Sequence, residues 1–429
     1  MFEKLQKPID IAILVYFRFF AGLLLAQELV NALVIGKFTE FTSPLFHFSY
    51  LYLDWIKPWP AWGMGLHYTV TIVAGLAVAM GYKFRISAVI LFVGYTTLFL
   101  MDMSAYINHN YLYCLISFWL IWLPLDRTQL KAKAPAWMLY LILFHMALAY
   151  FYAGIAKLNP DWIAGKPMDI FLKARGGHPL GDIYSHPSSP IFFSWGGIVF
   201  DLFIVPALLW KKTRWGALIA AIAFHLSNVM MFGLATFPWF SLVLTTMFFD
   251  PSWPRKIPGF QRFLLAEINE DSYGPRPIPL FLGIYIVFHL LLPLRHHLLY
   301  PGPPSWSEEG HMFSWRMMLR NKKGNVQFWV RNKETGKMRY VHPQGFLTIR
   351  QHNSMIGKPD LILQFAHFLR DRYNEEGEDV EVFASSRISL NGRPPREIIR
   401  PGTDLAQEER SVFPYTWIMD INDLQVVKD

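Results

Sequence analysis

The run AWMLYLILFHMALAYFYAGIA, residues 136–156, decides the fold class of this chain, and Lys157 ends it. A helix needs about 20 mostly apolar residues to cross a bilayer. This run has 21 residues, with His145 but no Asp, Glu, Lys or Arg, so it predicts a membrane-spanning helix. Ala153 and Gly154 stand just ahead of the lysine, and such small residues let a second helix approach closely.

The composition of the whole chain agrees with a membrane protein. Its 429 residues are 53% hydrophobic, 17% aromatic and 17% charged, which is too apolar for an ordinary soluble enzyme. The net charge is +8, but the basic residues form short clusters between apolar runs. That pattern is typical of the cytoplasmic loops of membrane proteins. We therefore expect a lipid bilayer as the surroundings and no nucleic acid partner.

Nine apolar runs predict nine membrane spans, with eight as the alternative because some runs are short or separated by tight turns. The first run contains Arg18 and Glu28 and lacks the cleavage site of a signal peptide, so we expect it to remain as a span. The predicted spans are residues 11–35, 61–81, 86–102, 109–125, 136–156, 191–210, 214–232, 234–249 and 278–299.

The basic residues between the spans predict the orientation. With nine spans, the connections on one side carry 14 Lys and Arg residues and those on the other side carry six. Basic loops stay in the cytoplasm, so we expect a cytoplasmic N-terminus and a periplasmic or lumenal C-terminal tail. The composition becomes that of a soluble protein near Ser305. We therefore expect a membrane domain over residues 1–304 and an extracytoplasmic domain over residues 305–429.

The tail has the pattern of a small α+β domain. Residues 327–341, QFWVRNKETGKMRYV, predict a β-hairpin around a polar turn that contains glycine. Residues 359–377, PDLILQFAHFLRDRYNEEG, have helical periodicity, with a start at Pro359 and a stop at Gly377. Residues 380–392, VEVFASSRISLNG, predict a further strand.

Ionisable side chains in or beside spans are costly in hydrocarbon, so by default they face the bundle interior or a wet cavity. The predicted orientation puts Asp102, His109 and Lys157 at the outer ends of their spans. His225 is about 11 residues into its span, roughly 16 Å from the inner end. The full set is Arg18, Glu28, Asp102, His109, His145, Lys157, Asp201, His225 and His289.

The candidate site residues each have a structural alternative. Lys157 either snorkels to the interface or is desolvated inside the bundle, where a neutral amine can act as a base. Asn108 and His109 either cap a helix or supply a donor and an acceptor to a site. His225 and Asn228 share a helix face and either make an interhelical hydrogen bond or contribute to a site.

The other titratable groups are expected to be structural. His145 and His289 are expected to be structural, and Cys114 is expected to be a small buried hydrophobe. A single cysteine allows no intramolecular disulfide. The histidines lack HExxH spacing, and no cysteine or carboxylate cluster has metal-ligand spacing, so we expect no metal site.

Five motifs resemble, in the same order, those of the vitamin K-dependent γ-glutamyl carboxylases, whose membrane part is called the HTTM domain. The tail segment NKETGKMRYVHPQGF, residues 332–346, is also similar to this family, so the resemblance covers nearly the whole chain. The five motifs are INHNYLY (107–113), YFYAGIAKLNPDW (150–162), FHLSNVMMFGLATFPW (224–239), PSWPRK (251–256) and FSWRMM (313–318).

The resemblance implies oxidation of reduced vitamin K, a quinol, by O2, coupled to removal of a proton from a glutamyl residue of a protein or peptide substrate and its carboxylation by CO2. It matches Lys157 to the family's catalytic base, His109 to its catalytic histidine and Asn108 to the neighbouring asparagine. His225 and Asn228 would then line the quinone pocket. Met317 and Met318 would supply adaptable apolar surface there.

Three departures leave other readings open. The segment EGHMFSW, residues 309–315, differs from the family pattern linked to glutamate binding, and Arg316 replaces an acidic residue. The chain also lacks the long extension and the disulfide of the animal enzymes. A quinol epoxidase with lost or altered carboxylation and a non-catalytic HTTM scaffold or carrier therefore remain alternatives. The compact length favours a bacterial inner membrane over the endoplasmic reticulum, and the oligomeric state is left open.

Overall fold

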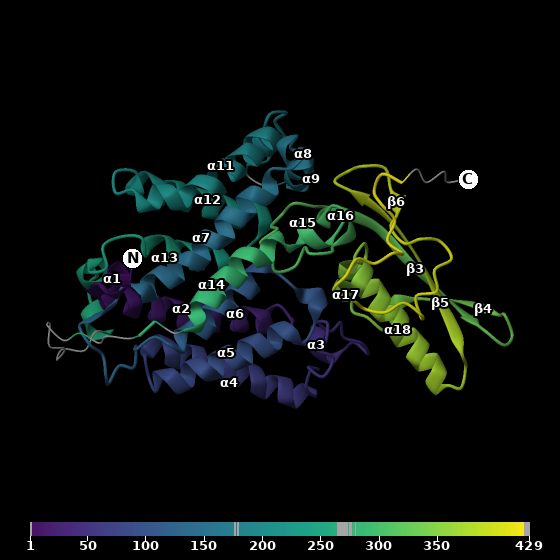
Figure 1. Cartoon of the computed structure of the whole chain (residues 1–429), viewed down its shortest axis with the longest axis horizontal. Helices are drawn as coiled ribbons and strands as arrows, with labels where there is room; N and C mark the ends of the chain where they lie inside the picture. The colour runs from purple at the N-terminus through teal and green to yellow at the C-terminus, as the bar shows by residue number, and fades with distance from the viewer. Residues whose placement is uncertain are drawn as a thin grey trace.

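The computed structural model describes residues 2–175, 177, 180–263, 273, 277–278 and 280–423. Arg276, one of the residues counted for the orientation, and the end of the predicted outer domain, 424–429, lie outside the described residues. The described part of the chain is mainly helical, with 57% of the described residues in helices. A helical bundle forms one end of the molecule and a small sheet with its helices forms the other (Figure 1).

Among the described residues, six helical segments are long and apolar enough to cross a membrane. Each matches one of the predicted spans. They are α2 (Ala12–Val34), α4 (Ala61–Met80), α7 (Trp137–Lys157), α11 (Ser189–Leu209), α12 (Arg214–Phe232) and the segment Phe281–Leu299, which consists of α14 (Phe281–Leu291), η4 (Leu292–Leu294) and α15 (Arg295–Leu299).

The count of nine spans is not confirmed, because three predicted spans form shorter helices. These are α5 (Phe84–Leu100), α6 (Asn108–Leu120) and α13 (Phe237–Thr246). At 1.5 Å per residue, the 13 residues of α6 reach only about 20 Å, less than the roughly 30 Å of a hydrocarbon core. The apolar pattern located these helices correctly but did not mark where each one ends.

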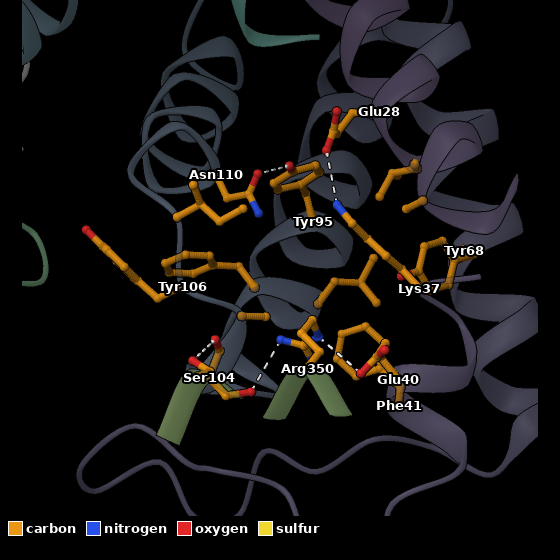
Figure 2. A pocket seen from close by; sticks show the side chains of 17 residues that line it. Glu28, Lys37, Glu40, Phe41, Tyr68, Tyr95, Ser104, Tyr106, Asn110 and Arg350 are labelled. Atoms are coloured by element: carbon orange, nitrogen blue, oxygen red, sulfur yellow. Dashed lines mark hydrogen bonds and ion pairs between the residues drawn. The ribbon is translucent and has the colours of Figure 1, made fainter. Parts of the chain in front are cut away.

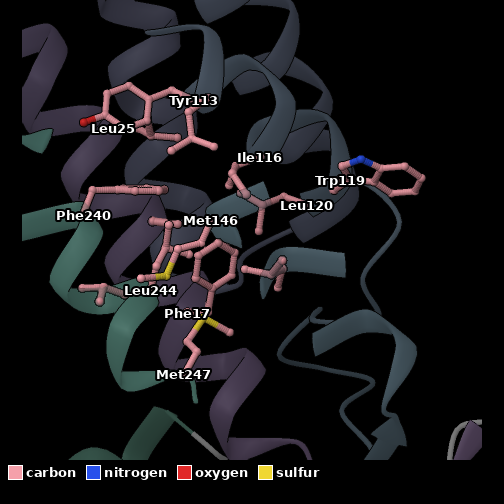
Figure 3. Close-up of a cluster of buried hydrophobic side chains, with 14 of the residues drawn as sticks. Phe17, Leu25, Tyr113, Ile116, Trp119, Leu120, Met146, Phe240, Leu244 and Met247 are labelled. Atoms are coloured by element: carbon pink, nitrogen blue, oxygen red, sulfur yellow. The ribbon is translucent and has the colours of Figure 1, made fainter. Parts of the chain in front are cut away.

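Small residues bring the long helices together. A Cβ atom on Gly22 of α2 would lie 2.5 Å from the backbone oxygen of Gly75 in α4. A Cβ atom on Gly154 of α7 would lie 2.6 Å from Leu202 of α11, as the position of Gly154 suggested. Figure 3 shows the apolar core that the bundle buries. Its labelled members are Phe17, Leu25, Tyr113, Ile116, Trp119, Leu120, Met146, Phe240, Leu244 and Met247.

The outer domain contains a four-stranded antiparallel sheet in the order β4–β3–β5–β6. The predicted hairpin is confirmed by the pairing of β3 (Lys322–Asn332) with β4 (Met338–Val341). The predicted helix is α18 (Pro359–Glu375), and the predicted strand is β5 (Val380–Leu390). The helix packs on the sheet, and the hydrophobic core between them also takes in Phe48, Tyr50 and Met103 from the bundle side. The last strand, β6, is Arg396–Glu397.

The remaining elements are short and connect or flank these two parts. On the bundle side they are α1 (Phe2–Gln6), β1 (Pro8–Asp10) paired with β2 (Lys133–Pro135), α3 (Thr39–Thr42), η1 (Met103–Ala105), α8 (Pro160–Ile163), α9 (Lys166–Lys173), α10 (Gly181–Ser185), η2 (Trp253–Lys256) and η3 (Phe260–Phe263). Between the bundle and the sheet, and within the outer domain, they are α16 (Pro304–Ser307), η5 (Pro343–Gly345) and α17 (Ile349–Met355).

Candidate functional site

A cavity of about 620 Å³ lies where the bundle meets the outer domain, and we call it the junction cavity. Asn108 and His109, at the start of α6, line it from the bundle side. Met317 and Met318 line it from the segment that follows α16. Four of the seven predicted site residues, from segments about 200 positions apart in the sequence, therefore share one cavity.

Asn108 joins the two walls of this cavity. Its Oδ1 accepts a hydrogen bond from Tyr106 at 3.0 Å, and its Nδ2 donates to the backbone oxygen of Arg316 at 3.2 Å. The same Tyr106 hydroxyl accepts from the backbone N–H of Phe313 at 2.7 Å. The N-cap position of α6 is occupied by Ile107, and no side chain caps the helix. Asn108 therefore does not act as the helix cap.

His109 presents its ring beside an aromatic wall. The ring stacks on Phe237 with centroids 5.3 Å apart, and Tyr113 lies 5.7 Å away on the other side. Within the described part of the chain, neither ring nitrogen has a hydrogen-bond partner. The imidazole is therefore free to bond to a ligand in the cavity.

His225 lies behind the same aromatic wall rather than on the cavity surface. Its ring is 6.2 Å from that of Phe237, and its Nε2 is 2.7 Å from the hydroxyl of Tyr150. Its buried Nδ1 has no partner among the described groups. Neither His225 nor the half-buried Asn228 lines the junction cavity, so the structure does not bring them to it.

Lys157 is buried, with 6% of its surface exposed. Its ammonium forms an ion pair with Asp201 of α11 and lies 5.4 Å from the ring centre of Trp162. The snorkelling alternative is wrong for this geometry, because the side chain turns into the bundle. Lys157 does not line the junction cavity either.

Asp201 is the neighbour of Lys157 that sequence reasoning did not select. It appeared among the costly intramembrane groups, but nothing in the sequence paired it with a base. One signal was present: Asp201 is the only charged residue in Ser189–Leu209, and buried charges in spans usually pair with one another. A lone acid and a lone base in two apolar runs could have suggested the pair.

Tyr150 is hydrogen-bonded to one of the two buried polar groups of the bundle and lies near the other. It is seven residues before Lys157 on α7, which puts both side chains on one helix face. Its hydroxyl meets His225, and Asp201 lies within its electrostatic range. The His225–Tyr150 hydrogen bond and the Lys157–Asp201 pair are thus adjacent groups of one buried polar region.

The segment 308–318 that walls the junction cavity has an unusual backbone. Four of its non-glycine residues have positive φ: Glu308 (68°), Phe313 (58°), Trp315 (55°) and Met318 (58°). Such values are uncommon for bulky side chains and persist only where the surroundings hold them. Residues of this kind cluster at functional sites, which suggests that the segment is shaped for a ligand.

A buried charge cluster anchors this segment to the outer domain. Both oxygens of Glu308 accept from Arg320 at 2.6 Å, and Lys322 donates to Glu308 at 2.6 Å. Burial opposes ionisation of Glu308, but the two cations outweigh it and hold the pKa of this carboxyl well below its usual value. Burial lowers the pKa of Lys322 to about 8 despite the pull of Glu308. The cluster therefore fixes one end of the cavity wall.

Two parts of the chain match known protein families. Residues 6–253 match the HTTM domain, and residues 276–424 match the vitamin K-dependent gamma-carboxylase lumenal domain. The chain belongs to the vitamin K-dependent gamma-glutamyl carboxylase family. No solved structure matches it. The apolar helices together with the lumenal-domain match make it a membrane protein with a lumenal-type domain.

Membership of the carboxylase family implies a vitamin K cofactor, and the junction cavity fits such a group. Its volume is in the range of small-molecule sites, and its lining is more apolar than polar. Phe237 offers a flat aromatic face, the methionines offer adaptable surface, and His109 offers an unpaired imidazole. Among the described residues, no group of three or more His, Cys, Asp or Glu is arranged to hold a metal ion.

The carboxylase-family chain has a second cavity on the other side of the start of α6, with a volume of about 310 Å³ (Figure 2). Here Lys37 lies 3.8 Å from Glu28, and Tyr95 donates to Asn110 at 3.2 Å. Tyr106 and Ile107 border both cavities. None of the seven predicted site residues lines this second cavity.

Proposed function

We propose that this chain is an integral-membrane enzyme that couples oxidation of reduced vitamin K by O2, with epoxide formation, to carboxylation of glutamyl residues by CO2. One observation carries the proposal. The junction cavity is walled by both family-matched regions, with His109 and Asn108 from the HTTM part and Met317 and Met318 from the lumenal part. A site that needs both regions is expected for a reaction that joins a lipid-soluble quinol to a water-soluble peptide.

When bound, reduced vitamin K supplies the oxidisable quinol whose reaction with O2 drives removal of the glutamyl proton. The chain contributes the surroundings. Phe237, Met317 and Met318 hold an apolar ring and keep water away from it, which preserves strongly basic species. His225 and Asn228 lie off the cavity wall, so their proposed role is to position Phe237 and Tyr150.

The Lys157–Asp201 pair is the proposed acceptor of the quinol proton. For the step to balance, the Lys157 ammonium first passes a proton to Asp201, and the neutral amine at Nζ then takes the quinol proton while Asp201 fixes the direction of that amine. Since neither Lys157 nor His225 touches the junction cavity, a bridging molecule would have to carry the proton from the cavity to the unpaired Nδ1 of His225, and the route would continue from its Nε2 to the Tyr150 hydroxyl, 2.7 Å away. This indirect route differs from the expectation from the sequence, in which a lone desolvated Lys157 amine would be in direct contact with the quinol.

His109 is proposed to act on the other half of the reaction. Its unpaired ring nitrogens can orient CO2 or stabilise negative charge that develops on the glutamyl side chain. Asn108 holds the outer segment against His109 through the backbone of Arg316. The two residues would then govern carboxylation more than quinol oxidation.

The membrane topology is part of the proposal. We propose nine crossings, with α5, α6 and α13 as short spans completed by their flanking residues. The N-terminus would be cytoplasmic, and the domain from residue 305 would lie on the opposite side of the membrane. That side is the periplasm for a bacterial inner membrane, which we propose, and the lumen for the endoplasmic reticulum. The family's lumenal-domain match supports the side chosen for the tail.

A specific assay tests this function. Purified protein in lipid nanodiscs receives reduced vitamin K, O2, labelled bicarbonate and a glutamyl peptide, and both epoxide and acid-stable label are followed. Both products are expected. Epoxide without label would favour the epoxidase alternative, for which the altered segment 309–315 and Arg316 are the motivation. Neither product from folded protein would favour the scaffold.

A further inference from the structure

Arg316 lies between two cavities. It lines the junction cavity, and it also lines an outer cavity of about 320 Å³. The outer cavity includes Asn159 and Asp161, just beyond Lys157, and Arg393 of the outer domain. One guanidinium group therefore borders both the proposed reaction site and a polar space beside it.

The guanidinium of Arg316 has no acidic partner among the described residues. Its Nη2 donates to the hydroxyl of Ser305 at 3.2 Å, and its buried Nε has no acceptor. Its own carbonyl oxygen is occupied by Asn108. Most of its five N–H donors are thus free for a ligand.

The neighbouring arginines differ in this respect, because each already holds an acid. Arg320 grips Glu308 with two hydrogen bonds, Arg393 grips Asp161 at 2.5 and 2.6 Å, and Arg410 bonds to Asp360 at 2.9 Å. These pairs occupy the carboxylates of Glu308, Asp161 and Asp360, and Glu309, which also lines the junction cavity, accepts from the backbone N–H of Tyr415 at 2.8 Å. A partly buried cation without a counter-ion is unfavourable in the free protein and favours binding of an anion.

The surroundings of Arg316 are consistent with a charged side chain that is held ready to bind an anion. Burial, followed by the charge of Arg320, lowers the pKa of Arg316 to about 10, against a smaller opposing effect of Glu308. The group still carries its charge at neutral pH. On either side of it, Trp315 and Met318 have positive φ, so the backbone that aims the side chain is held in one conformation.

We propose that Arg316, which borders both the outer cavity and the junction cavity, binds a carboxylate of the acceptor peptide. This rests on the proposed function, which requires a glutamyl substrate. A planar guanidinium matches a carboxylate with two parallel hydrogen bonds. The hydrogen bond from Asn108 to the Arg316 carbonyl holds the backbone of Arg316 against Asn108, the residue before His109. The polar outer cavity would accept the peptide backbone.

Binding measurements test the proposal without turnover. Full-length protein in nanodiscs is titrated with two short peptides that differ only by Glu or Gln at the acceptor position. The wild type is expected to bind the Glu peptide about tenfold to about 100-fold more tightly, as for a charged hydrogen bond. Arg316→Gln should abolish that preference. Arg316→Lys should keep part of it, because the charge remains without the fork.

Arg331→Gln is the matched control, since Arg331 pairs with Glu381 on the sheet away from both cavities. It should keep the full preference. A preference that survives in Arg316→Gln, or no preference in the wild type, would overturn the proposal. If the glutamine variant does not fold, an undiminished preference in Arg316→Lys overturns it instead. A wild type that prefers the Glu peptide but forms no label would refute the proposed reaction while this anchor stands.

Discussion

Lys157 of α7 and Asp201 of α11 form an ion pair inside the bundle, with 7% and 3% of their side chains exposed. A buried pair of this kind is costly to break from one side, because the remaining charge is left without a partner. It also gives the bundle a buried group that can hold a proton. The pair can therefore have a structural role, a chemical role or both.

Lys157→Met, Asp201→Leu and their combination separate these roles. Each single variant should lower the free energy of unfolding by about 3–5 kcal/mol, whereas the double variant should recover most of that loss. All three should lose quinol oxidation. Stability is measured by denaturant unfolding in detergent, and oxidation by epoxide yield. A double variant that is stable and oxidises quinol at the parent rate would reduce the pair to a structural element.

His109→Ala should impair carboxylation more than epoxidation, because the imidazole has no protein partner and faces the cavity from the side proposed for CO2. Stability should change little, as the change removes ring packing but no hydrogen bond. His342→Ala, an exposed histidine after β4, is the control. Equal losses of label and epoxide would remove the separate role assigned to His109.

Tyr150→Phe removes the hydroxyl between His225 and the ion pair. The lost hydrogen bond should cost about 1 kcal/mol of stability, and quinol oxidation should slow because the proposed proton path is interrupted. Tyr140→Phe, half-exposed on the same helix, should do neither. An unchanged epoxidation rate in Tyr150→Phe would exclude this path.

Glu308→Gln tests the cluster that holds the cavity wall. The change leaves Arg320 and Lys322 without their carboxylate. The free energy of unfolding should therefore fall by about 3–5 kcal/mol, an amount typical of a broken buried pair. Glu381→Gln breaks the more exposed pair with Arg331 and should cost less than about 1 kcal/mol. Similar losses in both variants would mean that the buried cluster has no special role.

Lys358 predicts a pH dependence. Burial, against the attraction of Glu308, lowers its pKa from 10.5 to about 8 in the folded chain. Between pH 8 and pH 10.5 the Lys358 amine binds more protons in the unfolded chain than in the folded one. Its contribution to the free energy of unfolding therefore rises as the pH rises from 8 to 10.5 and falls as the pH drops from 10.5 through 8. Unfolding midpoints across that range should rise less steeply with pH for Lys358→Met than for the wild type. Parallel curves would contradict the shift.

Much of the architecture could be predicted from local sequence patterns. The apolar runs located the bundle helices, and the alternating pattern of 327–341 located the hairpin. Gly154 correctly marked the close approach of α7 to α11. These features depend on residues near one another in the chain, and for that reason a single sequence contains enough information to find them.

The site was harder to predict from the sequence, because its geometry depends on which helices are in contact. Lys157 and Asp201 are 44 positions apart, and no spacing rule links them. His225 was expected to line the quinone pocket, but Phe237 stands between it and His109. The positive φ values of 308–318 also have no sequence signal, since bulky residues rather than glycines adopt most of them.

The most direct test of the central claim is acid-stable label on a glutamyl peptide, measured in parallel for the wild type and for the double variant Lys157→Met with Asp201→Leu. Both proteins are assayed folded, in nanodiscs, with and without reduced vitamin K. We predict label only for the wild type and only when reduced vitamin K and O2 are both present. Label that forms without reduced vitamin K, or no label from folded wild type, would contradict the account.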